Sequence, residues 1–169
     1  MTHRMVVVVT ALGVACGSAP ARQKTAVARA FVTRAPKDTV RFTAPAIATP
    51  CIGGIGRGLL IRGSTGGNGA IAWLRTADSL APGTWPLLQR GDTVSPRGAT
   101  VGVRFMLGDI AHGVALDSGD VTVTSTHPAV TLLVRGAGLA VAAAGRVVAE
   151  VAFDSVPVQT DTVSCRAHP

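Results

Sequence analysis

The chain has 169 residues, which favours one domain with short appendages, and 47% of them are hydrophobic, enough to bury a sizeable core. Only 15% are charged and 20 are glycine, a composition that points to short strands joined by tight turns. The formal charge of +7 is concentrated in residues 22–41, which hold six basic residues and one acidic residue, whereas residues 42–169 are nearly neutral, so a nucleic-acid-binding protein is not predicted.

Residues 1–15 have the three-part organisation of a secretory signal peptide. Arg4 precedes an apolar run over residues 5–12, and small residues follow around Cys16. The run is shorter than the roughly 20 residues that a membrane-spanning helix needs. No later stretch is long enough either. The sequence therefore predicts an exported protein without a transmembrane helix.

The end of this segment resembles the signal peptides of bacterial lipoproteins. Val14, Ala15 and Cys16 match the last three positions of that family's motif, while Gly13 departs from it because leucine is usual there. The resemblance implies diacylglyceryl transfer to the Cys16 sulfur, cleavage before Cys16 and acylation of the new amine. Gly17, in place of an aspartate, implies the outer membrane in a bacterium that has one.

An ordinary signal peptide cut after Ala21 is the alternative, and it would give a secreted protein. On the lipoprotein interpretation, residues 16–38 form a basic tether. Such a tether beside a membrane would be attracted to anionic headgroups by about 1 kcal/mol per Lys or Arg. A soluble spacer and a short helix over residues 23–33 are the other interpretations of this segment.

The three cysteines are an odd number for an exported protein. If Cys16 carries lipid, Cys51 and Cys165 remain, and an oxidising compartment favours a disulfide between them. Two free buried thiols are the alternative. A zinc site is not predicted because no second Cys or His lies near either cysteine at ligand spacing.

From residue 39 to residue 169 the pattern becomes short alternating or apolar runs, which predicts a single β domain. Residues 59–61 and 71–74 flank a glycine-rich stretch and predict a hairpin. Further strands are expected at 85–88, 101–107, 113–116, 121–124, 130–134, 139–143 and 147–153, with turns at 81–83 and 117–119. Without crossover helices these strands pair antiparallel, as a β-sandwich or, alternatively, a closed β-barrel. The pattern resembles small exported β proteins of bacteria and implies no activity.

Two motifs of common enzymes are missing. The run of residues 53–58 is rich in glycine, but its spacing is not that of a dinucleotide-binding loop and no Lys-Ser or Lys-Thr ends it. No serine lies in a nucleophile elbow. No catalytic residue and no cofactor is predicted on these grounds.

The best cluster of functional side chains consists of two histidines and three aspartates, and it could bind a divalent metal. Its members are Asp109, His112, Asp117, Asp120 and His127. The alternative interpretation is that the aspartates stabilise turns through bonds to their own backbone, and it is the preferred one.

Three other residues have predicted positions. Trp73 lies inside an apolar strand and is expected in the core, whereas Trp85 follows a Pro-Gly turn and is a candidate for exposure. Glu150 lies between apolar neighbours and is expected on the outer face of a strand.

Taken together, the sequence predicts a lipid-anchored protein of the cell envelope, at the outer membrane or facing the periplasm, with a binding or structural role. Its expected partners are the membrane, through the anchor, and an unknown protein or small molecule. The alternatives are a small barrel that carries an apolar ligand and a metal-dependent enzyme that uses the region of Asp109 and His112.

Overall fold

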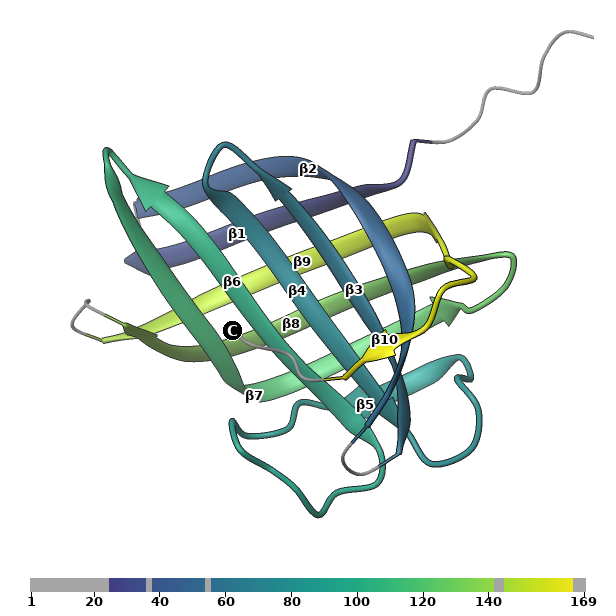
Figure 1. The fold of residues 1–169 in the computed structure, drawn as a ribbon. Helices are drawn as coiled ribbons and strands as arrows, with labels where there is room; N and C mark the ends of the chain where they lie inside the picture. Colours follow the sequence, from purple (N-terminus) through teal and green to yellow (C-terminus); the bar gives the residue numbers. More distant parts are fainter. Residues whose placement is uncertain (1–24, 36–37, 54–55, 142–144, 166–169) are drawn as a thin grey trace, which may run out of the picture.

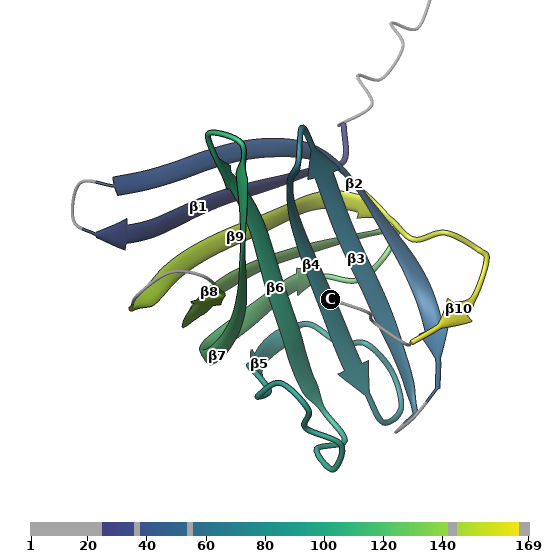
Figure 2. The ribbon, with the colours of Figure 1, turned by 60° about the vertical axis from the view of Figure 1, so that its left-hand side comes forward.

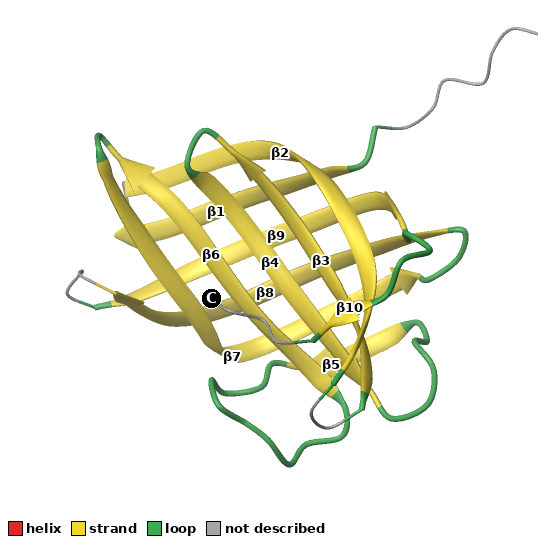
Figure 3. Ribbon diagram, in the orientation of Figure 1, coloured by secondary structure: helices red, strands yellow, loops and turns green. Residues whose placement is uncertain are grey.

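The computed structural model describes residues 25–35, 38–53, 56–141 and 145–165. These residues form strands joined by turns and loops, with no helix among them (Figure 3). No helix that could cross a membrane occurs in the described part of the chain. The strands are β1 (Val27–Ala35), β2 (Asp38–Ile52), β3 (Arg57–Thr65), β4 (Asn68–Thr76), β5 (Gly83–Pro86), β6 (Gly98–Leu107), β7 (Ile110–Ser125), β8 (Ala129–Val141), β9 (Arg146–Pro157) and β10 (Val163–Ser164).

Eight of the strands close into a barrel. Their order around the wall is β1-β9-β8-β7-β6-β4-β3-β2, and β1 also pairs with β2, so the sheet returns to its first strand. All neighbours in this ring are antiparallel. The prediction of a mainly antiparallel β fold is confirmed, and of the two predicted arrangements the chain adopts the closed barrel instead of the sandwich.

Long strands make the closure possible. The first half of β2 pairs with β1 and its second half with β3, so this strand belongs to two parts of the wall. Likewise β7 pairs first with β6 and then with β5, while β8 accompanies it throughout. The ribbons of β3, β4 and β6 cross those of β1, β9 and β8 steeply (Figures 1 and 2), so the barrel has two facing walls like a sandwich.

Several sequence predictions about local structure and boundaries are wrong. β1 begins at Val27, within the expected tether of residues 16–38 and ahead of the expected domain start at residue 39. It is a strand where a short helix was considered, because its alternate side chains join the barrel interior. The expected turn at 117–119 is a bulge inside β7, where Gly119 has a φ of +117° and the register with β8 shifts.

The barrel interior is packed with apolar side chains. The inward residues of β1, β2 and β4 are mostly alanine, whereas larger side chains project from β6, β7, β8 and β9; these are Val101, Val103, Phe105, Leu116, Val121, Leu132, Val134, Val151 and Phe153. This pairing of small and large residues fills a small barrel. Phe105, Val134, Val151 and Phe153 have no accessible surface, so no water-sized space adjoins them.

A disulfide joins Cys51, near the end of β2, to Cys165, with 4.8 Å between the Cα atoms. β10 pairs with β2 in parallel beside it. The predicted pairing of these two cysteines therefore fits the fold. It links the last described residue to the wall of the barrel, 114 residues back along the chain.

Candidate functional site

The predicted metal cluster is dispersed along β7. Asp109 lies exposed in the turn before the strand, while His127 lies exposed in the turn after it, roughly 60 Å away along the strand at about 3.3 Å per residue. His112 points into the barrel, whereas Asp117 and Asp120 are on the solvent side. No group of three or more His, Cys, Asp or Glu side chains able to hold a metal is found in the described part of the chain.

His112 is the one member of this cluster in the interior. Its ring stacks on that of Phe105, 5.5 Å away and inclined by 14°. Its Nδ1 atom is buried and has no hydrogen-bond partner. A catalytic histidine is normally oriented by a partner at one ring nitrogen, and no described carboxylate plays that role here.

Asp117 is part of a surface ion pair at the β7 bulge. Arg146 of β9 donates hydrogen bonds to the Asp117 carboxylate and to the Ser118 hydroxyl, the latter at 2.8 Å. The hydrogen bonds from Arg146 hold the pKa of Asp117 below its usual range. The pair ties β9 to the bulge, which is a structural role.

Arg75, at the end of β4, is buried, and sequence analysis did not single it out. Its Nη1 atom donates to the Asp92 carboxylate at 3.2 Å and to the Ser95 carbonyl at 2.8 Å. The guanidinium also lies over the ring of Trp73, 4.8 Å from its centroid. This arrangement fastens the long loop between β5 and β6 to the barrel.

Asp92 is held by the residues that follow it. The Ser95 hydroxyl and N–H donate to its carboxylate at 2.7 and 2.8 Å, and the Val94 N–H donates at 3.0 Å. These bonds, that of the Ser95 hydroxyl most of all, together with Arg75, lower the pKa of Asp92 to about 2. The Asp-x-x-Ser spacing is the sequence signal for this local motif.

The two tryptophans lie opposite to expectation. Trp85 of β5 is buried in the apolar core of the barrel and donates from Nε1 to the Ala81 carbonyl at 3.3 Å. Trp73 is half-buried on the outer face of β4. Alternation along β4 turns Ala72 and Leu74 inward, so Trp73 must face out. Glu150 is on the outer face as predicted, where it pairs with Arg135 at 2.9 Å.

One stretch of the barrel wall is incomplete. β2 pairs with β1 along residues 38–45, but its ladder with β3 begins only at Ala46, because the hairpin of β3 and β4 ends there. We call residues 39–43 the β2 edge. Among the described residues, no strand pairs with the β2 edge on the side away from β1.

The backbone hydrogen bonds of β2 fix which groups this edge presents. The Ala46 N–H donates to the Ala26 carbonyl at 3.1 Å. The backbone N–H and C=O groups of the even-numbered residues of β2 therefore point toward β1. The Gln159 N–H donates to the Ala48 carbonyl at 2.8 Å, so another even-numbered residue of β2 follows the same alternation. The N–H and C=O groups directed away from β1 are therefore those of Thr39, Arg41 and Thr43.

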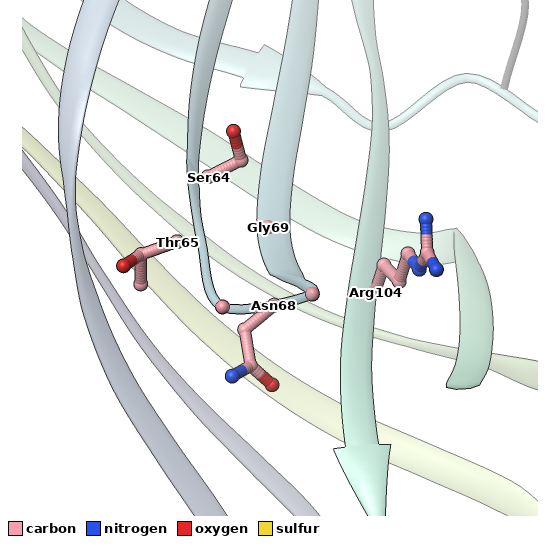
Figure 4. Close-up of a pocket in the computed structure, with 7 residues that line it drawn as sticks. Ser64, Thr65, Asn68, Gly69 and Arg104 are labelled. Atoms are coloured by element: carbon pink, nitrogen blue, oxygen red, sulfur yellow. The ribbon is translucent and has the colours of Figure 1, made fainter. Parts of the chain in front are cut away.

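The tip of the β3–β4 hairpin lies beside this edge. A shallow hollow of about 440 Å³ is lined by residues 64–69 and Arg104 (Figure 4). The Asn68 side-chain oxygen accepts from the Met106 N–H at 2.9 Å, which caps β6 where its ladder with β4 ends. Thr65 and Arg104 lie on opposite sides of the tip (Figure 4).

The wall around the tip is positively charged. Arg41, Arg62 and Arg104 are exposed on β2, β3 and β6, and none of them forms an ion pair with a described carboxylate. β3, β4 and β6 contain no acidic residue. The β2 edge thus combines backbone groups that have no partner strand in the described part of the chain with an electropositive surround.

Cys16, the predicted lipid attachment site, lies outside the described residues. Comparison of the chain with protein-family models, with curated proteins and with solved structures finds no match.

Proposed function

We propose that this chain is a lipid-anchored protein of the cell envelope whose barrel binds a partner at its outer surface. The observation that carries the proposal is the disulfide between Cys51 and Cys165, which accounts for two of the three cysteines and leaves Cys16 as the third. Cys16 ends the segment that resembles a lipoprotein signal peptide. A disulfide also fits an oxidising compartment.

The packed interior favours surface binding over transport of an apolar ligand inside the barrel. A barrel that carries a ligand needs an internal space lined by apolar side chains. The central side chains Val134, Val151 and Phe153 touch no such space. The surface, by contrast, has an incomplete wall at the β2 edge.

The anchor is tested by expressing the full chain in a bacterial host with a clickable fatty acid and determining the mass of the mature N-terminus. We expect a diacylated and N-acylated Cys16, with the protein in the membrane fraction. Cys16→Ala should abolish labelling. The double variant Cys51→Ala/Cys165→Ala, which keeps Cys16, should still be labelled. An unmodified terminus at Arg22 would refute the anchor and favour plain secretion.

A further inference from the structure

We propose that the β2 edge binds an extended segment of a partner protein, in which acidic and apolar residues alternate, as an added strand. The inference rests on the proposed binding role and names the partner's chemistry. It combines two independent observations: backbone groups of residues 39–43 that pair with no described strand, and arginines around them that pair with no described carboxylate.

The backbone of the edge can pair with a short strand. The N–H and C=O groups of three residues point away from β1, because backbone groups alternate in direction along the strand. These residues are Thr39, Arg41 and Thr43. Strand addition to such an edge supplies main-chain hydrogen bonds, and alternate side chains supply specificity. Proteins usually protect exposed edges. Asn68 does so for β6 at Met106, whereas no described side chain does so for the β2 edge.

The side chains around the edge define the partner's pattern. On the outer side an added strand would lie beside Arg41 and near the positive surface of β3 and β6, which selects acidic residues. On the inner side it would cover Val40, which is half-buried, and extend the core at Phe42. Successive side chains of a strand alternate between faces, so the predicted partner alternates acidic and apolar residues.

A second copy of this chain is a poorer occupant. Two β2 edges that pair antiparallel about their centre would place Arg41 directly opposite Arg41. Like charges at opposed positions destabilise a pair of strands. The Arg41 guanidinium already lies over Phe31, 5.6 Å from the ring centroid, so its charge is held at this surface.

The probe is a fluorescent, end-capped seven-residue peptide that alternates Glu and Val. Its binding to the protein, purified from a bacterial host in its processed form, is measured by fluorescence anisotropy. A peptide with Lys in place of Glu is its control. We expect saturable binding of the Glu peptide alone. Thr43→Pro removes one edge N–H and should weaken binding about tenfold, while the matched Thr43→Val keeps that N–H and should bind as the wild type does.

Charge is tested with Arg41→Glu, for which we expect a loss of about tenfold. Its matched control is Arg57→Glu, the same charge change at the start of β3, which is the end away from the tip. Amide hydrogen exchange gives a second readout that does not depend on variants. Peptide should protect the N–H groups of Thr39, Arg41 and Thr43, which should exchange rapidly without it.

Several results would overturn the proposal. These are no binding at millimolar peptide, equal binding of the Glu and Lys peptides, or unchanged affinity in both edge variants. Edge amides already protected without peptide would mean that another part of the same chain, or a second copy, covers the edge. Because lipid attachment plays no part in this assay, a negative result would leave the Cys16 anchor standing, and loss of the anchor would leave peptide binding standing.

Discussion

Removing the disulfide should destabilise the barrel strongly. The bridge between Cys51 and Cys165 closes a covalent loop with a sequence separation of 114 residues, which contains β3 to β10. In the chain-entropy model, a loop of this length raises the free energy of unfolding by about 5 kcal/mol at 25 °C. Measured values often fall below this limit, so we expect the double variant Cys51→Ala/Cys165→Ala to lose about 3–5 kcal/mol.

For a domain of this size, that loss corresponds to a Tm lower by about 10–15 °C. The measurement is guanidinium and thermal unfolding followed by far-ultraviolet circular dichroism, with and without reductant. The reduced wild type should match the unreduced double variant, while Cys16→Ala should unfold as the wild type does. A loss below about 1 kcal/mol, or alkylation of both thiols in the denatured, non-reduced protein, would refute the reasoning.

Two further changes test the packing and the long loop. Phe153→Ala should lower the free energy of unfolding in denaturant by about 3–5 kcal/mol, because Phe153 has no accessible surface. Val148→Ala, on the outer face of the same strand, should lower it by less than about 0.5 kcal/mol. Equal costs would contradict the packed interior. The hydrogen bonds that lower the pKa of Asp92 stabilise the loop at every pH above the ordinary aspartate pKa of 3.8. This contribution is lost as the pH falls from about 3.8 through about 2, because the carboxylate becomes protonated. Tryptophan fluorescence should report loop release in this window, and Ser95→Ala should shift it to higher pH; an unchanged midpoint would rule out the Ser95 hydroxyl as the main cause.

Much of the local structure could be predicted because strands have a period of two residues. The alternation over residues 101–107 predicted β6, and the glycine-rich stretch between two apolar runs predicted the β3–β4 hairpin. Glu150 among apolar neighbours had to face outward for the same reason. The pairing of Cys51 with Cys165 followed from counting cysteines in a chain whose first residues resemble an export signal.

The tertiary structure decided what depends on distant pairing. Val27 lies opposite Asp154, and this contact between the two ends of the domain turns a possible sandwich into a barrel. No local pattern records it, so β1 resembled a tether.

The candidate sites were decided in the same way. Asp109 and His112 are close in sequence, but a turn residue and an inward residue of a strand do not converge. The β2 edge exists because the β3–β4 hairpin ends while β2 continues. The difference in length between β2 and the hairpin depends on how the two strands pair, which the sequence does not show. The sequence by itself therefore determined most of the strands and the cysteine pairing, and the closure of the sheet determined the first strand, the interior and the open edge.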